Sequence, residues 1–132
     1  MSQENVEVVR DAWRAYTTRG IDATLDYYSE DCVCEDVPEL PDRATYRGRE
    51  GLRERYRHFV EAWGDFAAEP MEFIDGGDVV VALIAMHGRG TGSGAPFDLL
   101  PGFVLEVRDG KIVRDRAFTS RRQALEAAGL LE

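Results

Sequence analysis

Asp36 is an acidic residue whose place in the sequence could suit acid–base chemistry. It ends a predicted short strand over residues 32–36, and an irregular stretch over residues 37–48 with two prolines comes next. A carboxylate that lines a pocket can act as a general base, which takes a proton from a bound substrate. The alternative is a solvated side chain at the start of a loop. The two interpretations differ in whether the fold encloses a cavity and whether Asp36 lines it.

Four aromatic residues lie on the inward faces of predicted helices, where they could line such a pocket. They are Trp13, Tyr16, Tyr28 and Tyr56. Each presents an apolar ring with one hydrogen-bonding group, which suits a hydrophobic core as well as a ligand-binding cavity. Tyr56 has the best claim to the pocket, and core packing is the alternative for all four.

Arg116 becomes a candidate for anion binding if the C-terminal hairpin has its simplest register. Asp109-Gly110 predicts a two-residue type I′ turn, because both central residues of that turn need positive φ. In the resulting register Phe103 and Arg116 share the apolar face of the sheet. An inward arginine must be paired or must bind an anion, and Asp36 is one candidate partner. If a bulge interrupts the register, Arg116 instead turns out to solvent.

Apolar residues at helical spacing indicate the helices that position these side chains. They predict a first helix that begins at Ser2 as N-cap and ends at Gly20, and a third over residues 52–63. Between them Asp22 can cap a short second helix. Ser120 and Gln123 form a capping box that begins a last short helix near the C-terminus.

The strands are predicted mainly in the second half of the chain. After the strand over residues 32–36, the predicted strands cover residues 68–74, 79–88, 97–108 and 111–118. Because Pro70 cannot donate to a ladder, its strand is expected at an edge or at a bulge. Helices, a strand, a helix and then a meander are the order of an α+β domain. The strand over residues 79–86 is apolar on both faces, which predicts a homodimer packed through the outer face of the sheet.

Composition and charge exclude several classes of partner. The chain has 132 residues and a formal net charge of −9, which argues against a nucleic-acid or anionic-membrane surface. The N-terminal segment has no apolar signal-peptide core and no segment approaches a membrane span, so we expect a cytoplasmic protein. Cys32 and Cys34 are expected to be small buried hydrophobes, and no metal or cofactor is predicted. Fifteen arginines against one lysine suggest a bacterial source.

Three stretches of the chain resemble the nuclear transport factor two-like superfamily. They are GIDATLDYYSEDCVCED, YRGREGLRERYRHF and EVRDGKIVRDRAF. Within the superfamily the chain looks most like the SnoaL-like polyketide cyclase and ketosteroid isomerase group. The resemblance implies a single domain over residues 1–132. It also implies a curved mixed or antiparallel sheet, which three helices of the N-terminal half wrap into a cone with an internal pocket, and usually a homodimer.

The resemblance also implies roles for individual residues. Cys34-Glu35-Asp36 matches the Glu-Asp pair of ketosteroid isomerase, which places Asp36 at the general base. The stretch LRERY over residues 52–56 places Tyr56 at the tyrosine that supports the oxyanion hole, and Trp13 falls at the oxyanion-binding tyrosine. The oxyanion hole of the isomerase has a second donor, a protonated carboxylic acid. The matching residues 100–104 of this chain contain no acid, so steroid isomerisation is not expected.

Two functional hypotheses follow. The first is a SnoaL-like protein that binds a small apolar or polyketide-like molecule and catalyses proton transfer of the isomerase or cyclase type. Asp36 and Tyr56 would be its catalytic residues, and its substrate would contact Trp13, Tyr16, Phe103 and Arg116. A hydrolase in which Asp36 activates water is a variant of it. The second is a non-catalytic ligand-binding or dimerisation module of the same fold.

Residues 38–46 are expected to form a mobile rim over the pocket.

Overall fold

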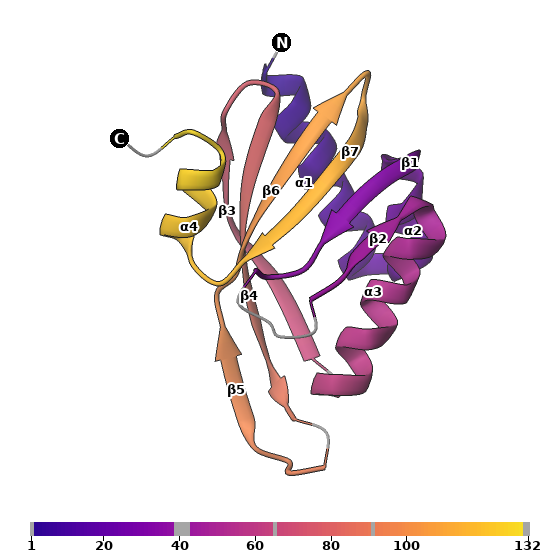
Figure 1. The fold of residues 1–132 in the computed structure, drawn as a ribbon, viewed down its shortest axis with the longest axis vertical. Coiled ribbons are helices and arrows are strands. Elements are labelled where there is room, and N and C mark those ends of the chain that lie inside the picture. The colour runs from indigo at the N-terminus through magenta and orange to yellow at the C-terminus, as the bar shows by residue number, and fades with distance from the viewer. Residues whose placement is uncertain (1, 39–42, 65, 91, 131–132) are drawn as a thin grey trace.

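The computed structural model describes residues 2–38, 43–64, 66–90 and 92–130 (Figure 1). The helices are α1 (Ser2–Arg19), α2 (Ile21–Thr24), α3 (Gly48–Trp63) and α4 (Arg121–Ala127), with a short 3-10 helix η1 (Leu25–Tyr27) after α2. The strands are β1 (Tyr28–Glu35), β2 (Thr45–Arg47), β3 (Phe66–Asp75), β4 (Val79–Arg89), β5 (Pro96–Leu99), β6 (Gly102–Arg108) and β7 (Lys111–Phe118).

The strands form one mixed sheet in the order β2-β1-β7-β6-β4-β3, and β5 pairs with the end of β4. β1 runs parallel to β7, whereas the other described pairings are antiparallel. The sheet is curved and unclosed, with α1, α2 and α3 on its inner side and α4 on its outer side (Figure 1). This architecture confirms the predicted α+β class with a curved sheet wrapped by the helices of the N-terminal half.

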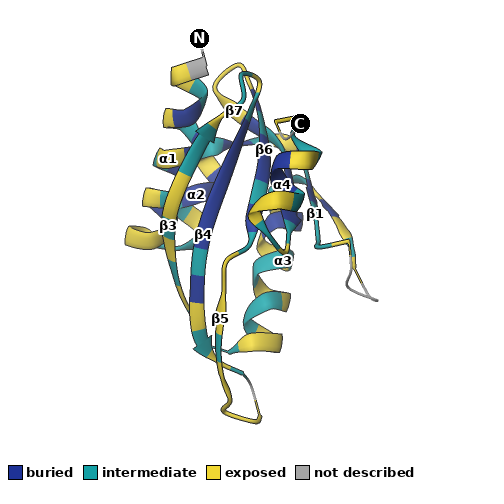
Figure 2. Ribbon diagram, turned by 90° about the vertical axis from the view of Figure 1, so that its left-hand side faces the viewer, coloured by how far each residue is buried: buried dark blue, intermediate teal, exposed yellow. Residues whose placement is uncertain are grey.

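The inner face of the sheet packs on the helices through small and branched apolar residues. Much of β4 and β6 is buried (Figure 2). The almost completely buried residues of this layer include Val9 of α1, Val80 and Ile84 of β4, Leu105 of β6 and Ile112 of β7. Alternate residues of a strand point to the same face, so Val80 and Ile84 share the inner face. The helix α1 ends as predicted, since the Gly20 N–H donates to the Tyr16 carbonyl at 2.9 Å and Gly20 adopts a φ of 94°.

The prediction of one strand over residues 97–108 is wrong, because the chain breaks into β5 and β6 at Leu100-Pro101. Proline has no N–H to donate to a ladder, so a continuous central strand would lose a hydrogen bond there. The Pro101 carbonyl instead accepts a hydrogen bond from the Ile84 N–H at 3.2 Å. This break lets β5 and β6 pair with successive parts of β4.

Other boundaries also differ from the sequence-based expectation. β1 begins at Tyr28 rather than at residue 32, and β2 lies inside the stretch that was expected to be irregular. Asp22 makes no side-chain cap for α2. Residues 39–42 of the predicted rim lie outside the described residues. Pro70 has both expected features, since β3 is an edge strand and its register shifts between Pro70 and Glu72.

The helix α4 covers much of the apolar outer face of the sheet. Val81 and Leu83 of β4 and Val104 of β6 are buried in a second cluster with Ala124 and Leu125 of α4. The predicted cap is present, because Ser120 Oγ accepts from the Gln123 N–H at 3.2 Å. The helix approaches so closely that a Cβ at Gly102 would lie 2.6 Å from the Cβ of Ala124. One chain therefore supplies cover that the sequence analysis assigned to a second protomer.

The C-terminal hairpin has the predicted turn but not the predicted register. Asp109 and Gly110 have φ values of 53° and 77°, as a type I′ turn requires. A bulge then shifts the pairing between Glu106 and Val107, which places Arg116 opposite Val104. Val104 packs under α4, so Arg116 faces α4 and not the cavity. Its Nη2 donates to the Ala127 carbonyl at 3.5 Å, which corrects the expectation that Arg116 contacts a substrate.

Candidate functional site

A cavity of about 870 Å³ lies between the helices α1 and α3 and the inner face of the sheet. Its walls are mainly apolar, with a small number of polar side chains, as is typical of small-molecule sites. Five of the six residues that the sequence analysis chose as site residues line this cavity: Trp13, Tyr16, Asp36, Tyr56 and Phe103. Arg116, the sixth, lies on the other face of the sheet.

The two tyrosines Tyr16 and Tyr56 form one polar group on the wall of the cavity. Their ring centroids are 5.7 Å apart. Burial raises the pKa of the Tyr16 hydroxyl above its ordinary value, and a hydrogen bond with Tyr56 raises it further. Trp13 contacts Tyr16 and Phe103 with centroid distances of 5.6 and 5.7 Å. The Tyr16 hydroxyl is therefore a hydrogen-bonding group that stays protonated at physiological pH, and it lies beside Tyr56.

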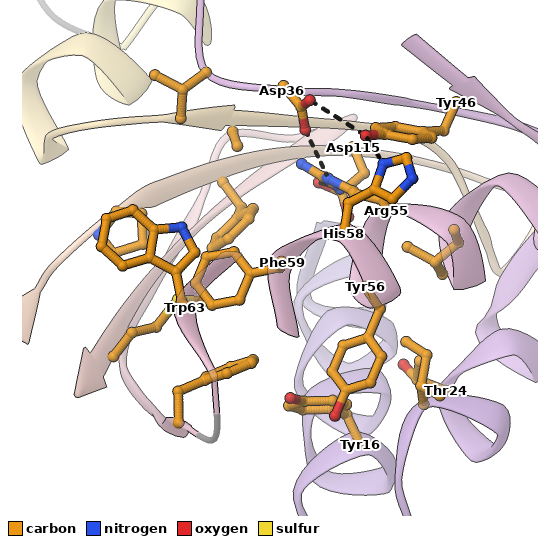
Figure 3. Close-up of a pocket in the computed structure, with 18 of the residues that line it drawn as sticks. Tyr16, Thr24, Asp36, Tyr46, Arg55, Tyr56, His58, Phe59, Trp63 and Asp115 are labelled. Atoms are coloured by element: carbon orange, nitrogen blue, oxygen red, sulfur yellow. Dashed lines mark hydrogen bonds and ion pairs between the residues drawn. The ribbon is translucent and has the colours of Figure 1, made fainter. Parts of the chain in front are cut away.

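Asp36 lies on the wall away from these tyrosines (Figure 3). Its Oδ2 accepts a hydrogen bond from the Ala44 N–H at 3.0 Å, and its own N–H donates to the Ala44 carbonyl at 3.1 Å. Its Oδ1 lies 3.8 Å from Nε of Arg55, and its side chain is 20% exposed. The backbone contacts fix the carboxylate where β1 ends, and Arg55 offsets its negative charge.

Asp115 of β7 and Arg55 of α3 form a buried ion pair beside Asp36, which the sequence analysis missed. Nη1 of Arg55 lies 3.0 Å from Oδ1 of Asp115, and these side chains are only 13% and 6% exposed. The Tyr28 hydroxyl donates to Oδ2 of Asp115 at 2.6 Å, and Nη2 of Arg55 donates to the Glu35 carbonyl at 3.0 Å. The pair therefore has hydrogen-bonding partners on β1 as well.

These contacts fix the charge states of the groups around Asp115. Burial alone would lower the pKa of the Arg55 guanidinium, but the Asp115 carboxylate outweighs this and the pKa lies above its ordinary value. Burial, and then the charge of Asp115, raises the pKa of the Tyr28 hydroxyl well above its ordinary value. Arg55 is thus a permanent cation in the wall of the cavity, and it also lies over the Phe103 ring at 5.8 Å.

Helical spacing could have indicated Arg55 from sequence. It follows Leu52 by three residues and precedes Phe59 by four, and residues at these separations share one face of a helix. Asp115 could not be found in the same way, because it lies opposite Leu105 and faces inward only as a result of the bulge in the hairpin. Sequence patterns alone would have placed Arg114 and Arg116 there instead.

Within the described residues, the cysteines and the side chains of types that can bind metals form no further candidate site. Cys32 and Cys34 are free and fully buried, as expected for small apolar residues. No group of three or more His, Cys, Asp or Glu side chains within the described residues could hold a metal ion. No helix in this part of the chain is long and apolar enough to cross a membrane.

Solved structures from several bacteria share this fold. A putative SnoaL-like polyketide cyclase from Jannaschia sp. CCS1 is 18% identical, with a TM-score of 0.72 over 98% of this chain and 94% of that one. An NTF2-like protein of unknown function from Burkholderia pseudomallei is 19% identical, with a TM-score of 0.76 over 93% and 95%. A protein with a ketosteroid isomerase-like fold from Catenulispora acidiphila, in complex with trimethylamine, is 23% identical, with a TM-score of 0.71 over 95% and 94%.

The family assignment comes from the sequence. Comparison with curated proteins gives no significant match. Residues 9–115 match the SnoaL-like domain family, a span that includes the C-terminal part of α1, all of α3, Asp36 and most of the sheet. The stretches that suggested the resemblance lie largely within this span. The chain therefore belongs to the SnoaL-like domain family.

Proposed function

We propose that this protein binds a small, largely apolar molecule in the cavity and catalyses proton transfer on it, with Asp36 as the general base. The observation that carries the proposal is a carboxylate on the wall of an apolar cavity of about 870 Å³, held by the Ala44 N–H and beside the charge of Arg55. A positioned carboxylate can take a proton from carbon or oxygen of a bound ligand. The Catenulispora protein of similar fold carries a small molecule, trimethylamine, which supports the binding role.

The positive charge of Arg55 beside Asp36 also suits proton transfer. When Asp36 has taken a proton, the ligand is left with one more negative charge, and a fixed cation near that charge stabilises the reacting state. Arg55 is held by Asp115 and by the Glu35 carbonyl, so it need not move during the reaction. The charge next to the base thus comes from Arg55, in place of the Arg116 that the sequence analysis proposed.

We infer that Tyr56 acts together with Tyr16. The pair lies away from Asp36 (Figure 3), so Asp36 and the tyrosines would contact different atoms of the ligand. We assign Tyr16 and Tyr56 to a second polar group of the ligand, to which a hydroxyl can donate. The ligand class is therefore an apolar, ring-containing molecule with an acidic C–H or O–H near one end and a hydrogen-bond acceptor near the other.

A crystal structure with 2-naphthol tests the binding part of this proposal. 2-Naphthol is a bicyclic phenol whose hydroxyl imitates an enol. We expect it inside the cavity with its oxygen within about 3 Å of an Asp36 carboxylate oxygen. Binding outside the cavity, or in the cavity with the hydroxyl only at Tyr16 and Tyr56, would contradict the assignment of Asp36. The competing function, a module without chemistry, predicts occupancy without a contact to Asp36.

A homodimer through the outer face of the sheet remains a prediction. Since α4 already covers Val81, Leu83 and Val104, a second protomer would bury the remaining surface, which carries the ion pairs of Arg114 with Glu35 and Glu106. We expect a dimer with a partly polar interface that weakens as salt is added. Sedimentation equilibrium at low and high salt would measure this, and a monomer at both would contradict it.

A further inference from the structure

The polar contacts of Asp36 continue from the cavity to the surface of the molecule. The Tyr46 hydroxyl on β2 lies 3.5 Å from Oδ2 of Asp36 and 3.0 Å from Nδ1 of His58 on α3 (Figure 3). Tyr46 is buried, whereas the side chain of His58 is 48% exposed. The three side chains therefore connect a carboxylate in the cavity with an imidazole in contact with solvent.

The hydrogen bonds among Asp36, Tyr46 and His58 can run in two directions. When Asp36 is a carboxylate and His58 carries a proton on Nδ1, His58 donates to Tyr46 and Tyr46 donates to Asp36. When Asp36 is protonated and Nδ1 of His58 is bare, Asp36 donates to Tyr46 and Tyr46 donates to His58. Burial and the charge of Asp36 raise the pKa of the Tyr46 hydroxyl, so Tyr46 stays a phenol in both arrangements.

We propose that Tyr46 and His58 form a proton relay between Asp36 and solvent, an inference that rests on the proposed role of Asp36 as base. After Asp36 has taken a proton from the ligand, that proton passes to the Tyr46 oxygen while the hydroxyl proton of Tyr46 passes to Nδ1 of His58. One O–H bond breaks at Asp36 and one forms at Tyr46; one O–H bond breaks at Tyr46 and an N–H bond forms at His58. Asp36 is again a carboxylate. The imidazolium loses a proton from Nε2 to water, and the neutral ring returns to the tautomer with a bare Nδ1 by proton exchange with solvent before the next turnover.

The surroundings of His58 suit this role. Its Nε2 lies 3.9 Å from Oε1 of Glu54, a half-exposed carboxylate. His58 and Glu54 line a hollow between β2 and α3. The other charged residues that line this hollow are Arg47 and Glu50. Arg55, next to Asp36, is fixed in its ion pair with Asp115 and offers no acceptor for a proton. The described contacts thus give Asp36 one hydrogen-bonded route to an exposed titratable group.

Nitrogen-15 NMR of the two histidines tests the relay without any ligand. His87, on the outer face of β4 with Asp98 3.3 Å away, is an internal control. We expect Asp36→Asn to move the midpoint of the His58 titration to lower pH by about half a unit or more. The substitution removes the negative charge that, through Tyr46, favours the protonated form of His58. The His87 midpoint should not move. In a Tyr46→Phe background the effect of Asp36→Asn on His58 should be largely lost.

The double-variant cycle separates a hydrogen-bonded relay from a charge effect through space. The relay is overturned if Asp36→Asn shifts the His58 midpoint equally in the wild-type and Tyr46→Phe backgrounds. It is also overturned if Asp36→Asn does not shift that midpoint in either background. Either result would leave the base role of Asp36 intact, because 2-naphthol binding tests that role separately. If the protein exchanges hydrogen on a bound ketone, His58→Phe should slow the exchange at least about tenfold, and added imidazole should restore part of the rate.

Discussion

Arg55→Met is expected to lower the free energy of unfolding by about 3–5 kcal/mol. The substitution leaves Asp115 as a charge that is only 6% exposed and has lost its cation, while the Glu35 carbonyl loses a donor. Removing one partner of a buried pair is costly because the remaining charge is neither hydrated nor compensated. Urea denaturation followed by circular dichroism measures the change.

Two further variants make this prediction specific. Arg57→Met, on the same helix, removes an exposed arginine whose Nε is 4.0 Å from Glu61, and it should cost less than about 1 kcal/mol. Adding Asp115→Leu to Arg55→Met should restore part of the lost stability, because no unpaired buried charge remains. If Arg55→Met is no more destabilising than Arg57→Met, the buried ion pair does not hold α3 to the sheet.

The sequence was enough to predict most of the fold, because the elements that matter most have strong local patterns. Apolar spacing identified α1 and α3, and Asp109-Gly110 identified the turn between β6 and β7 with both φ values positive. Pro70 indicated an edge and a bulge, and β3 has both. The long strand over residues 97–108 was wrong, because alternation of apolar residues outweighed Pro101 in the prediction.

The candidate site was predictable only where a residue follows a local pattern. Asp36 ends a strand and Tyr56 lies on an apolar helix face, and both line the cavity. Asp115 and Arg116 exchange their expected faces because one bulge in the hairpin changes the alternation. Tyr46 and His58 meet only through the packing of β2 on α3, a tertiary contact without a sequence spacing that predicts it.

Asp36→Asn is expected to abolish proton transfer while leaving the fold intact. An asparagine keeps the shape and can still accept from the Ala44 N–H through its carbonyl oxygen, but it cannot take a proton. Removing a general base lowers the rate by about 10²–10⁴-fold. Glu35→Gln is the matched control, since Glu35 is the preceding residue and its carboxylate pairs with Arg114 at 2.9 Å on the outer face.

The rate of deuterium incorporation into 2-tetralone in D₂O, followed by proton NMR, tests the central claim most directly. 2-Tetralone is a bicyclic apolar ketone with an acidic C–H next to its carbonyl group. We expect the wild-type protein and Glu35→Gln to accelerate incorporation with saturation, 2-naphthol to compete, and Asp36→Asn to reduce the acceleration by at least about 10²-fold. Incorporation by Asp36→Asn at the wild-type rate, or no acceleration by the wild-type protein although 2-tetralone occupies the cavity, would contradict the assignment of Asp36 as a base.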